Sequence, residues 1–139
     1  MSRMRSKMSK KNKWYIDPER YLELLHFCRQ YPDWIENAKT LMNTKYGIRK
    51  LEEPRKNYEA DPTADIAIKL ARINKRIGLI QESLKEASGT DSDMYEWLMM
   101  GITKDISYDS MYMLGIPCGK DYYYDCYHKF FYILDQKRD

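Results

Sequence analysis

A long apolar seam between residues 61 and 88 constrains the fold of this chain more than any other feature. Asp61-Pro62 places a capping carboxylate before a proline at the first helical position, and Ser88-Gly89 supplies a stop signal. Between these signals the apolar residues recur at alternating steps of four and three, at Ile66, Leu70, Ile73, Ile77, Ile80 and Leu84. This spacing predicts one long helix that packs its seam against a partner. The seam is short for self-association, so a partner within the chain is favoured over a homodimer through the 61–88 helix.

Residues 14–60 are predicted to form a helical hairpin followed by a loop. The first helix should begin at Asp17-Pro18, which repeats the cap-then-proline signal, and should end at Tyr31-Pro32. Its apolar face is expected at Ile16, Tyr21, Leu24, Leu25 and Cys28. Asp33 should cap the second helix, which should stop near Tyr46-Gly47 because dense charges without a period follow, up to residue 60. The apolar face of this second helix is expected at Trp34, Ile35, Ala38, Leu41 and Met42.

Three short helices are predicted over residues 91–139. Asp91, Ser92 or Asp93 should cap the first of them, and Ser107 should cap the second. The buried residues of these two helices are expected at Met94, Trp97, Leu98, Ile102, Met111 and Leu114. Gly115 should end the second helix, and the third should run from about residue 119 to residue 135. Its apolar face is expected at Tyr123, Tyr127, Phe130 and Leu134.

The composition agrees with an all-α fold. The 139 residues include only six glycines and five prolines, which are too few for the turns of an all-β chain, while 43% are hydrophobic. We therefore expect a single helical domain over residues 14–139. The three cysteines are an odd number at scattered spacings, which predicts reduced thiols. No segment has the length and apolarity of a membrane span, so we expect a soluble cytoplasmic protein with no membrane partner.

The charge is distributed unevenly along the chain. Residues 1–13 form a basic arm, expected to be disordered, with six cations and no acid: Arg3, Arg5, Lys7, Lys10, Lys11 and Lys13. The other 126 residues hold 18 basic and 21 acidic side chains. Such an arm is typical both of a tail that binds phosphates and of an ordinary solvated terminus, and the sequence leaves these two interpretations open.

The three C-terminal helices have the layout of a helix-turn-helix, in which the second helix of the pair enters the major groove of DNA. Gly115 lies where the chain must turn, and Ile116 can hold the turn against the core. Pro117 and Cys118 make this turn about two residues longer than the compact form. The residues predicted to face DNA on the last helix are Lys120, Tyr122, Cys126 and Lys129, with the cations of the arm on phosphates.

Six segments of the chain carry a resemblance to a known family: Lys13 to Tyr21, Cys28 to Trp34, Asp61-Pro62-Thr63, Gly115 to Asp121, Tyr124-Asp125 and Lys129-Phe130-Phe131. They resemble small regulators encoded by prophages of low-GC Gram-positive bacteria, the late-gene transcription activators of the RinA and ArpU type. The resemblance implies a C-terminal helix-turn-helix similar to the DNA-binding region of sigma factors. It also implies double-stranded DNA and RNA polymerase as partners, at a phage promoter in the bacterial host cell.

The chain departs from this family on its last predicted helix, which is the helix expected to enter the major groove and read the DNA sequence. The relatives usually carry arginine at the positions of Cys126 and His128, and threonine at the position of Tyr122. Residues 115–139 hold four basic and four acidic side chains, so this region is neutral. Either the arm supplies the missing positive charge or a partner protein assists DNA binding.

No catalytic or metal-binding motif stands out, so we expect a protein that is not an enzyme and has no cofactor. His26 and Cys28, like Cys126 and His128, are two residues apart, whereas a chelating pair on a helix needs a spacing of three or four. A helical protein-interaction module that binds polymerase, an antirepressor target or a defence nuclease is the alternative function. A small terminase subunit is a third interpretation, which predicts a ring-shaped oligomer.

Overall fold

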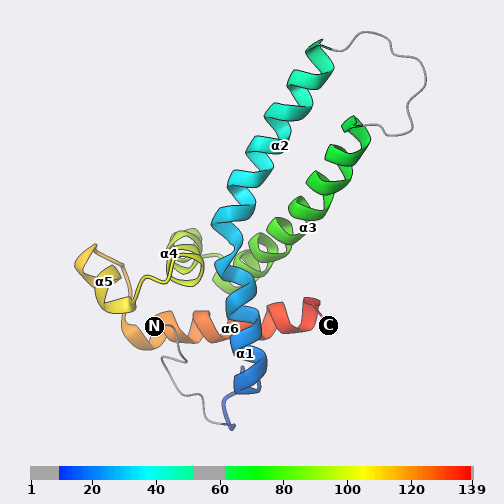
Figure 1. Cartoon of the computed structure of the whole chain (residues 1–139). Coiled ribbons are helices and arrows are strands. Elements are labelled where there is room, and N and C mark those ends of the chain that lie inside the picture. Colours follow the sequence, from blue (N-terminus) through cyan, green and yellow to red (C-terminus); the bar gives the residue numbers. More distant parts are fainter. Residues whose placement is uncertain (1–9, 52–61, 139) are drawn as a thin grey trace.

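The computed structural model describes residues 10–51 and 62–138, and these residues form six helices and no strand. The helices are α1 (Pro18–Arg29), α2 (Tyr31–Leu51), α3 (Pro62–Ser88), α4 (Ser92–Thr103), α5 (Tyr108–Met113) and α6 (Lys120–Arg138). Figure 1 shows α2 and α3 projecting as a hairpin from a base that contains α1, α4, α5 and α6. The predicted all-α fold is confirmed.

Helix α1 begins as its sequence signal predicts. The Asp17 carboxylate accepts a hydrogen bond from the backbone N–H of Glu19 at 3.1 Å, and Pro18 follows at the first helical position. The predicted apolar face of α1 is buried throughout. Asp61, the corresponding cap predicted for the long helix, lies outside the described residues. Helix α3 itself runs from Pro62 to Ser88 and is followed by Gly89 at φ +60°, as the stop signal predicts.

Helix α2 differs from its prediction at both ends. It begins at Tyr31, so Asp33 lies in its first turn, and the prediction of Asp33 as an N-cap is wrong. It continues through Gly47 to Leu51, so the predicted stop is also wrong. One glycine inside a helix costs about 1 kcal/mol, which does not end a helix that has a long helical neighbour. That neighbour is α3, which runs beside α2 in the projecting hairpin (Figure 1).

The seam of α3 packs within its own chain, against α2, α4 and α6. Its residues Leu70, Ile77, Ile80 and Leu84 are buried, and Ile66 and Ile73 are half-buried. Only Gln30 separates α1 from α2, and α2 packs mainly on α3. The hairpin that the sequence placed between the first two helices is therefore formed by α2 and α3 instead (Figure 1).

Helix α6 lies across the base of the bundle and packs on α1, α3 and α4 (Figure 1). Its predicted apolar residues are all buried, and so are Cys126, His128 and Phe131. The Tyr21 and Tyr127 hydroxyls hydrogen-bond to each other within this core, and the Tyr21 and Phe131 rings meet edge to face at 4.9 Å. Helix α6 is thus a central element of the fold, with a buried arc wider than that of a surface helix.

Two arginines of α1 tie this helix to the rest of the base. Arg20 pairs with Asp135 of α6 at 2.6 Å. Arg29 donates to the carbonyl of Ile102 at 2.9 Å and pairs with Asp105 at 2.9 Å, after the end of α4. These contacts fix both ends of α1 against helices that are distant in the sequence. None of the described helices has the length and apolarity needed to cross a bilayer.

Candidate nucleic-acid interface

The turn that precedes α6 is built by local backbone geometry. Ser107 caps α5 by accepting a hydrogen bond from the backbone N–H of Ser110 at 3.1 Å. At the other end, Gly115 has φ +95° and donates to the carbonyl of Tyr112, while Ile116 donates to the carbonyl of Met111. This pair of bonds is a Schellman motif, and its usual apolar contact is supplied by Met111 and Ile116, both buried. The turn therefore has a defined geometry.

The far side of the turn is held by a tyrosine. The Tyr108 hydroxyl donates to the carbonyl of Cys118 at 2.7 Å, which connects the start of α5 to the residues just before α6. The sequence predicted the cap at Ser107, the end at Gly115 and the burial of Ile116, and all three are confirmed. The prediction that Leu114 is buried is wrong, because its side chain is 65% exposed.

The first turns of α6 expose some of the residues predicted to face DNA. Lys120 and Tyr122 are exposed, and Lys129 is half-buried. Cys126 is only 5% exposed, so its prediction as a surface contact is wrong. Burial raises the pKa of the Cys126 thiol, while a hydrogen bond from Tyr122 acts in the opposite direction. Asp121 and Asp125 are also exposed here, and this face of α6 is not strongly basic.

Trp14 attaches the end of the basic arm to the outer face of α6. Its indole Nε1 donates to the Asp125 carboxylate at 3.2 Å, and its ring lies 5.4 Å from that of Tyr132 between centroids. The ammonium groups of Lys13 and Lys129 lie 4.9 and 5.8 Å from the centre of the Trp14 ring. The base of the arm and the cations of α6 are therefore neighbours. The sequence does not indicate this role of Trp14, because its partners on α6 are more than a hundred residues away along the chain.

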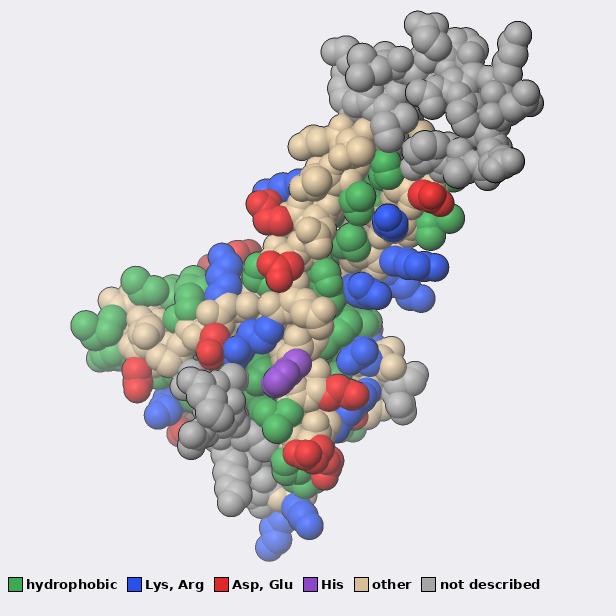
Figure 2. Space-filling model, viewed as in Figure 1, with side chains coloured by type: hydrophobic (Ala, Val, Ile, Leu, Met, Phe, Trp, Pro, Cys, Tyr) green, Lys and Arg blue, Asp and Glu red, His purple; other side chains and the backbone are tan. Residues whose placement is uncertain are grey.

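An apolar surface lies beside the turn. Tyr112, Met113 and Leu114 are 66%, 84% and 65% exposed, and they follow one another at the end of α5. Figure 2 shows hydrophobic side chains gathered at this end of the molecule. Exposed Asp109 and Asp121 flank these three residues in the sequence. We call Tyr112, Met113 and Leu114 the α5 patch.

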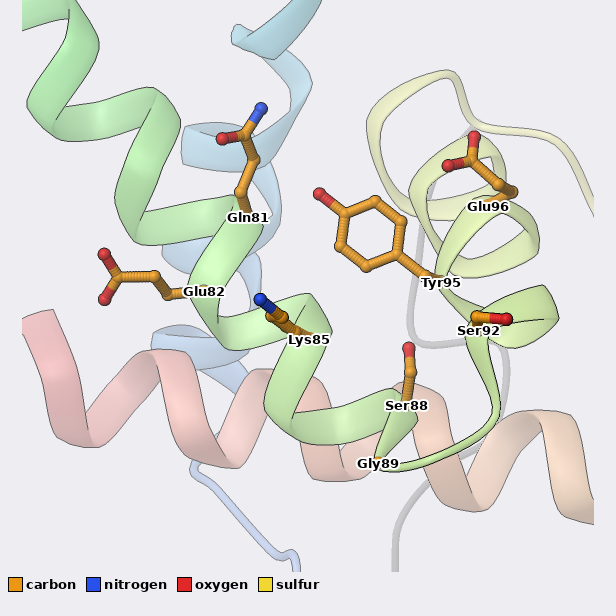
Figure 3. A pocket seen from close by; sticks show the side chains of 8 residues that line it. All are labelled: Gln81, Glu82, Lys85, Ser88, Gly89, Ser92, Tyr95 and Glu96. Atoms are coloured by element: carbon orange, nitrogen blue, oxygen red, sulfur yellow. The ribbon is translucent and has the colours of Figure 1, made fainter.

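A cleft of about 530 Å³ lies between the end of α3 and the start of α4 (Figure 3). Its lining residues are Gln81, Glu82, Lys85, Ser88, Gly89, Ser92, Tyr95 and Glu96. Burial raises the pKa of Tyr95, and the neighbouring Tyr31 and Glu96 act in the same direction. The Ser88 hydroxyl already donates to the carbonyl of Leu84 at 2.8 Å. This lining includes neither histidine nor cysteine, so it offers no nucleophile with an adjacent imidazole base.

The cysteines and the buried histidine lie in packed surroundings. Burial raises the pKa values of Cys28, Cys118 and Cys126, which keeps these thiols protonated at neutral pH. Burial lowers the pKa of His128 on α6, with the Asp125 carboxylate acting in the opposite direction. In the part of the chain that the structure describes, no group of three His, Cys, Asp or Glu side chains is placed to hold a metal ion.

Comparisons of this chain with protein-family models, with curated proteins and with solved structures find no match.

Proposed function

We propose that this protein is a DNA-binding transcriptional regulator that acts at a phage promoter together with RNA polymerase. The observation that carries the proposal is the contact of Trp14 with α6. It places the base of an arm with six cations beside Lys129, on the same helix that presents Lys120 and Tyr122 after a defined turn. A basic arm next to a reading helix is the arrangement by which other helix-turn-helix proteins contact two grooves.

The two parts of this surface would have different tasks. The start of α6 is nearly neutral, so it contributes little to neutralising phosphates, whereas the arm can release counterions from DNA. Only the first turns of a reading helix lie deep in the groove. Lys120 at the helix start is therefore the candidate for a contact with a base edge, and Lys129, more than two turns later, for a contact with the backbone.

The test begins with selection of bound sequences from random duplexes, followed by fluorescence anisotropy on the enriched duplex and on a scrambled one. We expect Lys120→Ala to cost about 1 to 3 kcal/mol on the enriched duplex and to relax the preference at one position. Lys129→Ala should weaken binding to both duplexes about equally. Lys104→Ala, which removes an exposed cation at the end of α4, is the matched control. Equal and weak binding to both duplexes, with no enriched sequence, would overturn the proposal.

A second candidate function, protein binding, is favoured by the α5 patch. Its three consecutive large side chains are each at least 65% exposed, and exposed apolar patches often mark protein interaction sites. We expect Met113→Asp to weaken binding to purified RNA polymerase at least tenfold, while DNA binding stays unchanged. Met42→Asp alters another exposed methionine, on α2, and serves as the control. Equal polymerase binding by both variants would remove the α5 patch as the contact.

A further inference from the structure

Helix α3 carries a second basic surface, separate from the arm. Between Asp65 and Glu82 the helix has no acidic residue and four basic ones, Lys69, Arg72, Lys75 and Arg76, all exposed. Figure 2 shows basic side chains gathered over the projecting hairpin. The sequence pattern alone attributes these cations to the solvated side of the seam, where charges are common. Their number and the absence of acids give this part of the helix a net charge of +4.

Three of these cations share one groove. Lys69, Arg72 and Arg76 are spaced three and four residues apart, so they lie on one face of α3 with rises of about 4.5 and 6 Å between them. They line a groove of about 410 Å³ between α2 and α3. The other lining residues are Asn37, Thr40, Leu41 and Ile73. Asn37 and Thr40 add an amide and a hydroxyl that can donate to phosphate oxygens.

The structure holds one of these arginines in place. The Arg76 guanidinium lies 5.8 Å from the centre of the Trp34 ring, and Trp34 is itself buried against Phe27, with ring centroids 4.9 Å apart. A guanidinium stacked on an aromatic face keeps N–H groups available for an anion and loses less conformational entropy when it binds. Arg76 is therefore partly organised for a ligand before the ligand arrives.

The ion pairs described in the structure lie away from this face. They join Arg20 to Glu23 and Asp135, Arg29 to Asp105, and Lys137 to Glu86. None of them involves the four cations of α3. Residues 91–125, in contrast, hold seven acidic and two basic side chains. Residues 66–81 thus have a net charge of +4, whereas residues 91–125 have a net charge of −5.

We propose that the groove face of Lys69, Arg72 and Arg76 binds the phosphate backbone of double-stranded DNA, as a contact additional to α6 and the arm. The inference rests on the proposed function. A duplex presents a continuous row of phosphates, so cations a few ångströms apart along a helix can each meet one, and arginine can do so with two parallel hydrogen bonds. The contact carries no sequence information and adds affinity and salt dependence.

The test compares the slope of log K against log salt on one 40-bp duplex by fluorescence anisotropy. We expect the R72Q/R76Q variant to have a slope smaller by about 1.8, since each lost phosphate contact removes about 0.9. The R72K/R76K variant should keep most of the slope, because it keeps the charge. K85Q/K104Q removes two exposed cations elsewhere and should keep the wild-type slope. Thermal unfolding midpoints within a few degrees of the wild type establish that the variants fold.

The outcomes separate this inference from the function on which it rests. If the wild type binds DNA with a preferred sequence and R72Q/R76Q has an unchanged slope, the groove face is overturned and the proposed function stands. A second outcome is that R72Q/R76Q loses DNA affinity, while Lys120→Ala and removal of the arm leave the affinity unchanged. That result would support the groove face and would contradict the proposal that α6 reads the DNA sequence. If poly-L-glutamate competes as well as the duplex, and R72Q/R76Q weakens its binding more, the face binds acidic proteins and the inference is overturned.

Discussion

At the scale of single residues, Gly101 shows how tightly the base of the bundle is packed. A Cβ atom at this position of α4 would lie 2.1 Å from the Tyr123 hydroxyl and 3.0 Å from Cε of Met111. We expect Gly101→Ala to destabilise the fold by about 1 to 3 kcal/mol, because α4 or α6 must shift to accept the methyl group. The measurement is the free energy of unfolding from urea titrations followed by circular dichroism.

Gly78→Ala is the control for this substitution. Gly78 lies inside α3, and a Cβ atom there meets only the Glu82 carboxylate, at 4.0 Å. Gly78→Ala should stabilise the fold by up to about 1 kcal/mol, because alanine has fewer accessible backbone conformations than glycine in the unfolded chain. Equal effects of the two substitutions would contradict the packing described around Gly101.

His128 gives the fold a pH dependence whose sign follows from its burial. Burial lowers the pKa of His128 in the folded state, so the unfolded state binds its proton more readily as the pH falls. The contribution of the neutral, buried His128 to the free energy of unfolding is fully present above the ordinary histidine pKa of about 6.5. It is lost as the pH falls below that value. The loss from one such group cannot exceed about 1.4 kcal/mol per pH unit. Urea unfolding at pH 7.5, 6.5 and 5.5 should show a flatter profile for His128→Gln, and parallel profiles would refute this account.

Two residues that the sequence misplaced have physical explanations. Leu114 follows Met111 by three residues, which puts both on one face of a continuous helix. However, α5 ends at Met113, and the chain turns at Gly115, so the helical period no longer applies to Leu114. From the sequence, Cys126 is predicted on the exposed face of α6, together with Lys120, Tyr122 and Lys129. It is buried because α6 is covered by three helices, which no pattern within α6 reveals.

At the scale of elements, α5 depends on its cap more than the longer helices do. It has six residues, and a helix of this length has too few internal hydrogen bonds to be stable alone. We expect Ser107→Ala to cost about 1 kcal/mol and Ser107→Asp to restore stability, since aspartate accepts the same bond from the helix start. Ser92→Ala, at an exposed position one residue after a cap, should change little. Hydrogen exchange of the α5 amides locates the effect, and unchanged exchange in Ser107→Ala would exclude this role for the cap.

Helix ends marked by local chemistry could be predicted, whereas ends and neighbours set by packing could not. Asp17 and Ser107 cap their helices as predicted, because an N-cap bond spans only two or three residues. For α4 the sequence leaves Asp91, Ser92 and Asp93 open, and the structure has Asp91 as the cap. The end of α2 depends instead on its packing against α3, so Gly47 does not mark it. For the same reason the sequence predicted a seam on α3 but not which helix would form the hairpin with it.

At the scale of the whole molecule, the sequence predicts how much charge each segment carries but not where the charged segments lie relative to one another. The excess of cations in residues 1–13 can be counted in the sequence, but the attachment of the arm to α6 depends on Trp14 meeting Asp125 and Tyr132. The groove cations of α3 likewise acquire a common surface only when α2 lies beside them. The turn before α6 could therefore be predicted from local sequence signals. The contacts of Trp14 with α6 and the groove between α2 and α3 join residues far apart in the chain, and one sequence does not reveal them.

The last prediction distinguishes two contributions of the arm to DNA affinity, its positive charge and its attachment beside α6. Deleting residues 1–9 removes Arg3, Arg5 and Lys7 and none of the described core, so the unfolding midpoint should stay unchanged. If these three cations contact phosphates, the slope of log K against log salt should fall by up to about 2.7. Trp14→Ala keeps every cation but releases the base of the arm from α6. It should therefore keep most of the slope and weaken binding at every salt concentration, because a freely moving arm loses more entropy when it binds.

Trp14→Phe refines this comparison, since phenylalanine keeps an aromatic face for Lys13 and Lys129 and loses only the hydrogen bond to Asp125. Its affinity should lie between those of the wild type and Trp14→Ala. The measurement is fluorescence anisotropy on one duplex from 50 to 300 mM salt. If Trp14→Ala binds as tightly as the wild type while the deletion weakens binding, the arm acts by charge alone. In that case the contact of Trp14 with α6 stabilises the fold and has no part in placing the arm on DNA.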